Sequence, residues 1–329
     1  MRAFVIDSFG GPDVFRVAEL PRPEPGRGEV LIRVAATSVN PVDYKIRAGA
    51  VAAIAPPFPA ILHGDVAGTV AAAGEGVSGL AAGDEVYGCV GGVGKVQGVL
   101  ADFAVADARL LARRPRAIAM AAAAALPLVA ITAWEGLDKA GDVDGRRVLV
   151  HGGTGGVGHL AVQLAKARGA EVTATCGSAE KARLAGELGA DHVVDYREET
   201  VEDYVGRLTG GRGFDVVFDT VGGENLQRSL AAARWNGSVV NIQARGRHDL
   251  GLAHLRGLSI HVVFMLIPLL HDVGRERHGR ILAEVAELVD AGRLRPLVDP
   301  GGFTFDRIGE AHAHAESGAA TGKVVVRRS

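Results

Sequence analysis

Residues 147–177 read RVLVHGGTGGVGHLAVQLAKARGAEVTATCG, and this stretch decides the fold. Three apolar residues, 148–150, are followed by a run rich in glycine. After it come Leu160, Ala161, Leu164 and Ala165, which share one face of a helix. The pattern predicts a β-strand, a tight turn and an α-helix.

The glycines of the predicted turn fall on the spacing G-x-G-x-x-G. Glycine permits the sharp turn, lets backbone N–H groups approach a pyrophosphate, and lets the helix pack closely on the strand. The helix N-terminus favours an anion through its free N–H groups and its dipole. We therefore interpret the loop as a dinucleotide site rather than a glycine-rich turn without a ligand. Its candidate cofactor-binding residues are Gly153, Thr154, Gly155, Gly156, Val157 and Gly158.

The composition indicates a globular protein with no electrostatic bias toward nucleic acid or membrane. A chain of 329 residues is long enough for two domains, and its net charge is only −2. The apolar run 262–270 contains Pro268 and is shorter than the roughly 20 residues of a spanning helix, so we expect a buried strand and a turn there. The first residues show no signal-peptide pattern, and Cys89 and Cys176 lie far apart in the sequence. We expect a cytoplasmic protein whose two cysteines are buried.

The chain divides into two patterns of predicted elements. Residues 1–120 contain short β segments, too close together for crossover helices, which predicts an antiparallel, barrel-like β domain. The alanine-rich segment 119–126 is expected to form a helix that stops near Pro127, and a second helix should end at Gly141. In residues 121–264 apolar runs alternate with helical segments, which predicts an α/β domain with a doubly wound parallel sheet of about six strands. Beyond 148–150, those runs are 172–175, 192–196, 215–219, 238–242 and 258–264.

The tail, residues 265–329, is too short to be a separate domain with confidence, so we expect it to fold back on the first one. It carries a predicted amphipathic helix over 280–291, a second helix that includes Ile308 and Ala311, and a final strand over 324–326.

Six segments of the chain resemble the medium-chain dehydrogenase/reductase superfamily, and within it the zinc-independent quinone oxidoreductases. They are SVNPVDYKIRAG at 38–49, GDVAGTV at 64–70, GDEVYG at 83–88, LPLVAITAWEGL at 126–137, GGTGGVGHLAVQLAK at 152–166 and FDTVGG at 218–223. The resemblance implies a Rossmann domain inserted into a GroES-like β-barrel catalytic domain, with a C-terminal return to the latter. The predicted last strand of the sheet, residues 260–265, is apolar on both faces and would leave an exposed edge. Family members pair this edge with a symmetry mate, so we expect a homodimer.

The resemblance also bears on metal binding. The zinc-dependent relatives have Cys in the place of Asn40, His in the place of Gly64, and a further cluster of four cysteines, none of which is present. His63 lies one residue from the ligand position and is expected to be hydrogen-bonded rather than metal-bound. His312 and His314 are interpreted as polar positions on a surface helix. We assign no metal ligand.

Without a Lewis acid, the family holds NADPH against an acceptor that takes hydride readily, such as a quinone or an α,β-unsaturated carbonyl compound. The resemblance makes Asn40 the residue beside the nicotinamide and the acceptor carbonyl, although it is also a turn residue before Pro41. Tyr44 is a candidate proton donor or lid residue, with a core position as the alternative. Thr132 resembles the residue facing the nicotinamide amide, or is an ordinary helix hydroxyl. Asp43 is expected to hold local backbone.

The expected cofactor is NADPH rather than NADH. NAD-binding enzymes place an acidic residue at the end of the second strand, and residues 175–178 here read TCGS. Ser178, Lys181 and Tyr196 are the candidates for the 2′-phosphate, the latter two by resemblance. Further candidate cofactor residues are Thr220, Ile242 and Lys323. Lys323 resembles a lysine near the cleft in some relatives, with a solvated charge before the last strand as the alternative.

Two other functional classes are considered. One is an NADPH-binding protein with a structural or regulatory role and little turnover, which sequence separates poorly from the enzyme. The other, a zinc alcohol dehydrogenase, is opposed by the missing ligands.

Overall fold

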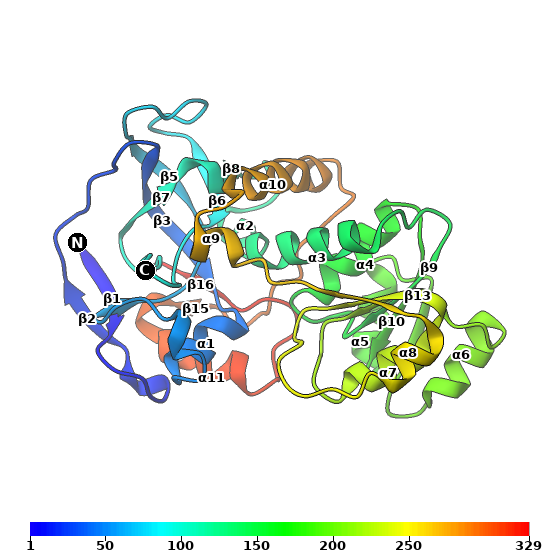
Figure 1. Cartoon of the computed structure of the whole chain (residues 1–329). Coiled ribbons are helices and arrows are strands. Elements are labelled where there is room, and N and C mark those ends of the chain that lie inside the picture. The colour runs from blue at the N-terminus through cyan, green and yellow to red at the C-terminus, as the bar shows by residue number, and fades with distance from the viewer. Residues whose placement is uncertain (329) are drawn as a thin grey trace. The chain divides into compact units, whose positions relative to one another are not determined.

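The computed structural model describes residues 1–328, which form two compact units (Figure 1). Unit 1 contains residues 1–131 and the segment from Leu266 onward, and unit 2 contains Thr132–Met265. The first boundary falls inside helix α3 (Pro127–Ala140), whereas the sequence led us to begin the second domain at 121.

Unit 2 is built on a six-stranded sheet in the order β11-β10-β9-β12-β13-β14, and every neighbouring pair is parallel. Its strands are β9 (Arg147–His151), β10 (Glu171–Cys176), β11 (His192–Asp195), β12 (Phe214–Asp219), β13 (Ala233–Asn241) and β14 (Ser259–Val262). The chain runs outward from β9 to β11 and then returns to β12 on the other side of β9. Ligands of such sheets bind outside the carboxyl ends of the strands at this switch point.

Helices connect successive strands, as the alternating pattern predicted. In unit 2, α4 packs on β9 and β10, α5 on β10 and β11, α7 on β12 and β13, and α8 on β13. The bounds are α4 (Gly158–Ala167), α5 (Ala179–Glu187), α6 (Val201–Thr209), α7 (Asn225–Ala232) and α8 (Gly251–Arg256). Leu149, Phe214 and Val217 lie in the apolar core, and each such side chain contributes about 1.5–3 kcal/mol by its burial.

Unit 1 is mainly antiparallel, as its short β segments predicted. Its larger sheet has the order β15-β16-β3-β5-β6-β8, with β7 also paired to β3, and a second sheet has the order β2-β1-β4. The strands are β1 (Arg2–Ile6), β2 (Arg16–Glu19), β3 (Glu29–Ser38), β4 (Ala60–Ile61), β5 (Asp65–Ala73), β6 (Glu85–Cys89), β7 (Phe103–Asp107), β8 (Leu111–Arg113), β15 (Phe303–Thr304) and β16 (Val325–Arg327). The pairing of β16 with β3 brings the tail back to the first sheet.

The helices of unit 1 are short, apart from one in the tail. They are α1 (Pro41–Arg47), α2 (Met120–Ala123), α9 (Ile267–His271), α10 (Arg275–Asp290) and α11 (Ile308–Glu316).

Two sequence expectations about these segments are wrong. The helix expected over 119–126 is only the four residues of α2, and Pro127 begins α3 instead of stopping a helix. Proline is favourable in the first helical turn, where its missing N–H has no partner to lose. The run 262–270 is not a buried strand, because β14 ends at Val262, which is 51% exposed, and α9 follows.

Candidate cofactor and active-site residues

Two glycines of the turn after β9 have no room for a side chain. A Cβ atom on Gly153 would lie 2.6 Å from Cβ of Ala174, and one on Gly158 would lie 2.0 Å from the carbonyl oxygen of Gly152. Real Cβ atoms do not approach other atoms this closely, so both glycines are required by packing. No side chain caps the N-terminus of α4, where Val157 is the N-cap residue. The turn therefore has the bare backbone and the helix end that a pyrophosphate needs.

The loop after β12 is held by Asp219, a fully buried carboxylate. Its Oδ1 accepts hydrogen bonds from the backbone N–H groups of Val221 and Gly222, both at 2.9 Å, and its Oδ2 accepts from Ser229 Oγ at 3.0 Å. The hydroxyl of Thr220 donates to the carbonyl oxygen of His151 at 2.6 Å. The structure thus brings Thr220 to the glycine turn, at the carboxyl ends of β9 and β12.

Ile242 follows β13 at the same edge of the sheet, and its N–H donates to the carbonyl oxygen of Asp219 at 3.3 Å. It is half-buried. Thr132 is buried on α3, where unit 2 begins.

The candidate 2′-phosphate residues lie at the ends of β10 and β11, which pair in register at Cys176 and Asp195. Ser178 caps α5, and its Oγ accepts a hydrogen bond from the N–H of Lys181 at 3.3 Å. Tyr196 is 54% exposed, and its hydroxyl lies 2.5 Å from where a Cβ of Gly177 would be. The structure therefore brings Ser178, Lys181 and Tyr196 to neighbouring positions on one sheet edge.

In unit 1 the side chain of Asn40 lies between a buried cation and a buried anion. Its Oδ1 accepts a hydrogen bond from Nζ of Lys323 at 2.5 Å, and its Nδ2 donates to Oδ2 of Asp65 at 2.7 Å. Lys323 is 3% exposed and Asp65 is fully buried. The solvated charge considered for Lys323 is therefore wrong. Burial lowers the pKa of Lys323, while Asp65 and Asp43 oppose that shift.

Helix α1 begins directly after Asn40. Oδ2 of Asp43 accepts a hydrogen bond from the N–H of Asn40 at 2.7 Å, so Asp43 holds local backbone as expected. Burial raises the pKa of Asp43 to about 7, although the hydrogen bond from Asn40 opposes the shift. Tyr44 lies one residue further on and is half-buried, and burial raises the pKa of its hydroxyl.

A pair of histidines is buried near this cluster. Nε2 of His63 and Nε2 of His312 are 2.8 Å apart, and Nδ1 of His63 is 3.1 Å from Oγ1 of Thr37. His63 is hydrogen-bonded as expected, but the assignment of His312 to a surface position is wrong, because it is fully buried. His314 is half-buried, and its Nε2 lies 3.1 Å from Oδ1 of Asp299.

The hydrogen-bond partners of the two histidines determine which ring nitrogens carry a proton. The hydroxyl of Thr37 donates to the carbonyl oxygen of Asp65, so it accepts from Nδ1–H of His63. Nε2 of His63 is then the acceptor for Nε2–H of His312. Burial lowers the pKa of His312 to about 3 and holds that of His63 well below its usual range, so both rings are neutral.

Sequence reasoning missed the roles of Asp65 and Asp219. Both lie in segments that carried the family resemblance, and each is an acid at one end of a mainly apolar strand. A buried carboxylate must be compensated by several donors, so an acid in such a place predicts a hydrogen-bonded hub.

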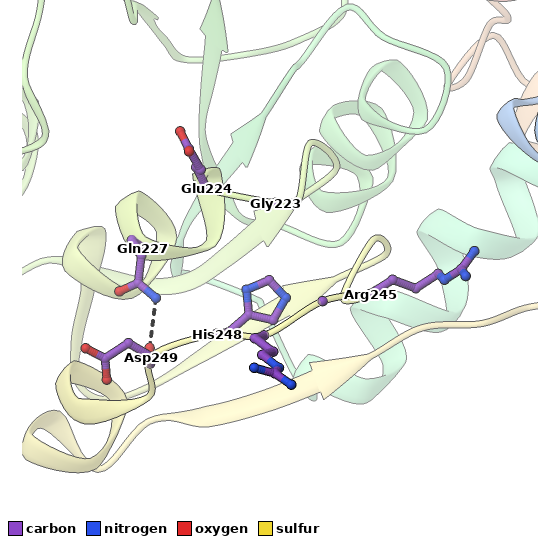
Figure 2. A pocket seen from close by; sticks show the side chains of 8 residues that line it. Gly223, Glu224, Gln227, Arg245, His248 and Asp249 are labelled. Carbon is purple, nitrogen blue, oxygen red and sulfur yellow. Dashed lines mark hydrogen bonds between the residues drawn. The ribbon is translucent and has the colours of Figure 1, made fainter. Parts of the chain in front are cut away.

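A shallow hollow lies outside β12 and β13 in unit 2 (Figure 2). It is lined by Gly223, Glu224, Gln227 and residues 245–249. Nε2 of Gln227 donates to the carbonyl oxygen of Asp249, while the side chains of Glu224 and Arg245 point in different directions. We assign the hollow no role.

The described residues contain neither a group of side chains suited to a metal ion nor a membrane-spanning helix. In residues 1–328, no group of three or more His, Cys, Asp or Glu side chains is arranged to hold a metal ion. Nor does this described part of the chain contain a helix long and apolar enough to cross a lipid bilayer. Cys89 and Cys176 are free and buried, as expected.

The parallel sheet and its glycine turn define a dinucleotide-binding protein of the two-unit oxidoreductase class. Residues 26–116 match the family model described as alcohol dehydrogenase GroES-like domain, and residues 188–326 match the one described as zinc-binding dehydrogenase. The chain belongs to the zinc-independent quinone oxidoreductases of the medium-chain dehydrogenase/reductase superfamily. Its fold is accordingly a Rossmann domain combined with a GroES-like domain.

Individual relatives cover nearly the whole chain. The NADPH-dependent alkenal/one oxidoreductase, chloroplastic, of Arabidopsis thaliana is 36% identical over 99% of this chain and 79% of its own length. An alcohol dehydrogenase superfamily protein from Novosphingobium aromaticivorans superposes with a TM-score of 0.95 at 41% identity, over 100% of both chains. The Escherichia coli quinone oxidoreductase complexed with NADPH superposes with a TM-score of 0.86 at 28% identity, over 99% of this chain and 100% of that one.

Proposed function

We propose that the protein is an NADPH-dependent oxidoreductase that reduces quinones or α,β-unsaturated carbonyl compounds. The observation that carries the proposal is the glycine turn of unit 2, in which added Cβ atoms would clash and the end of α4 has no side-chain cap. The activities in the names of the Arabidopsis and Escherichia coli relatives support this choice of cofactor and acceptor.

The residues of unit 2 bind and orient the cofactor in this proposal. Backbone N–H groups at the N-terminus of α4 hold the pyrophosphate, and the loop that Asp219 fixes places Thr220 and Ile242 at the same sheet edge. Bound NADPH supplies the hydride for the acceptor.

The residues of unit 1 act on the acceptor. Asn40 offers its amide to the acceptor carbonyl, and Tyr44 is the candidate proton donor. The hydroxyl of Tyr44 holds its proton more tightly than a free tyrosine, because burial raises its pKa. Thr132, at the start of unit 2, is proposed to face the carboxamide of the cofactor.

The choice of NADPH is assigned to the edge formed by β10 and β11. Lys181 supplies a positive charge, Ser178 marks the N-terminus of α5, and Tyr196 covers Gly177. The negative charge of the exposed Glu180 opposes binding of the 2′-phosphate of NADPH. The end of β10, however, carries no acid that would repel this phosphate. One or two charge-assisted hydrogen bonds, at about 1.5–3 kcal/mol each, give more than a tenfold preference.

We further propose a homodimer formed through β14. This strand is the edge of the sheet; Val262, its last residue, is 51% exposed, and Phe264, two residues further on, is 46% exposed. An apolar, unpaired edge is stabilised by pairing with a second copy. The buried free thiols Cys89 and Cys176 suit a reducing compartment, which we propose is the cytoplasm.

The test measures oxidation of NADPH with an ortho-quinone and with a short enal, alongside the dissociation constant of NADPH from fluorescence titration. Acceptor-dependent oxidation by either compound is expected. Tight NADPH binding without such oxidation would favour the alternative of a binding protein with little turnover, and zinc-dependent alcohol oxidation abolished by a chelator would contradict both.

A further inference from the structure

The strongest unassigned arrangement in the described chain is the set of charges around Asn40. Lys323 Nζ donates to the carbonyl oxygen of Val39 at 2.8 Å as well as to Oδ1 of Asn40. Oδ2 of Asp65 accepts from Ser38 Oγ at 2.8 Å and from Asn40 Nδ2, and it lies 3.7 Å from Nζ of Lys323. An ammonium group and a carboxylate therefore hold the two ends of one amide.

This arrangement fixes the direction of the amide by chemistry alone. A carboxylate only accepts hydrogen bonds and an ammonium only donates them. Turning the amide by 180° would place Oδ1 against the carboxylate of Asp65 and the NH2 group against the ammonium of Lys323. Both contacts would be repulsive, so the orientation is specified without reliance on the positions of N and O in the structure.

The hydrogen bonds that remain to Asn40 are then limited. Its Oδ1 faces Lys323 and one N–H faces Asp65, which leaves the second N–H of Nδ2 as a donor with no partner that the structure assigns. We infer that Lys323 and Asp65 are positioning residues, which present Asn40 as a donor for the carbonyl oxygen of the acceptor. This rests on the proposed function and adds to it a direction: Asn40 donates and does not act as a base.

Burial supports a positioning role over a stabilising one. Buried ion pairs contribute little net stability, because desolvation offsets the attraction, and their attested use is to specify one arrangement of their neighbours. Asn40 is itself fully buried, so its donor is already desolvated, and a covering group must move before an acceptor reaches it. A preorganised donor of this kind stabilises charge that develops on oxygen without reorganising first.

The competing explanation is structural. Lys323 precedes β16, and its bond to Val39 joins the tail to the segment after β3, so removing it would loosen unit 1 without any action through Asn40. The two explanations differ in whether the effect of Lys323 on turnover depends on Asn40.

A double-mutant cycle separates them, with Asn40→Ala, Lys323→Met and the combination. We expect Asn40→Ala to lower kcat for an enal on the order of 100-fold, as loss of one oxyanion donor does, with little change in the dissociation constant of NADPH. Lys323→Met should lower kcat about 10-fold or more, and the double variant should be no slower than Asn40→Ala alone. Equal factors for Lys323→Met in both backgrounds would overturn the inference. Lys139→Met, which removes an exposed lysine on α3, is the matched control.

Two further measurements keep the test decisive. Lys323→Gln retains a donor and should keep more of kcat than Lys323→Met. Lys323→Gln also takes the place of Lys323→Met in the test if that variant fails to fold. The side-chain amide signals of Asn40, identified by their loss in Asn40→Ala, should shift in NMR spectra of Lys323→Gln and not of Lys139→Met. Unshifted signals would overturn the inference whether or not the protein turns over, whereas a wild type that reduces no acceptor counts against the proposed function alone.

Discussion

Acid should destabilise the fold through histidines that are buried without charge. His63, His312 and His151 are all buried, and burial lowers the pKa of His312 to about 3 and that of His151 to about 4. In the unfolded chain each has a pKa near 6.5. Between these values the unfolded chain binds protons that the native state does not, so stability is full above pH 6.5 and falls as pH decreases.

Asp43 acts in the opposite direction. Its pKa is about 7 in the native state and about 3.8 unfolded, so between these values the native state binds one proton more. When the protein unfolds in this pH range, the three histidines together take up about three protons and Asp43 releases about one. The net uptake is therefore about two protons. At about 1.36 kcal/mol per proton and pH unit, stability should fall by roughly 2–3 kcal/mol between pH 6 and pH 5. Carboxylates with lowered pKa values respond only at more acidic pH.

The assay is urea unfolding followed by circular dichroism at several pH values, in wild type and in His312→Gln. Glutamine can still donate to Nε2 of His63 but does not titrate, so the variant should lose about 1.4 kcal/mol less per pH unit than wild type. His254→Gln, which changes an exposed histidine, should keep the slope of wild type. Equal slopes in all three proteins would refute the assignment of His312 as a buried neutral base.

Three other predictions concern binding and assembly. Lys181→Ala should reduce the preference for NADPH over NADH in kcat/KM by about tenfold or more, and an undiminished preference would show that this edge does not select the phosphate. Gly158→Ala should weaken NADPH binding more than tenfold in fluorescence titration, because the Cβ of the new alanine would lie 2.0 Å from the carbonyl oxygen of Gly152. The control is Gly186→Ala on α5, where a Cβ meets open space. Light scattering should give a dimer mass for wild type and a monomer for Val262→Lys, which charges the edge strand; a monomeric wild type would contradict the dimer.

The sequence was sufficient for most of the fold because the fold depends on periodic patterns. Alternation of apolar strands and helices predicted the parallel sheet, and the glycine spacing predicted the turn between β9 and α4. The expectation for Pro127 is wrong because a proline can either end a helix or begin one, and only the packing of the following residues decides which occurs.

The candidate site was harder to predict because its contacts are distant in sequence. Asn40 is 283 residues from Lys323 and 25 from Asp65. No local pattern shows that a lysine before the final strand is buried against an asparagine near the start. His312 was likewise assigned to the surface because its partner, His63, is 249 residues away.

The two segments of unit 1 also impose an order on folding during synthesis. Unit 2 is continuous in the chain, so every strand of its sheet has been made before the tail is translated. Strand β3 can pair with β5 and β7 early, but its pairing with β16 must wait for residues 325–327. Until Lys323 arrives, the carboxylate of Asp65 has no counter-charge from the tail. A nascent chain therefore carries a complete nucleotide-binding sheet before the environment of Asn40 is assembled, and a ribosome-bound intermediate should acquire cofactor affinity earlier than turnover.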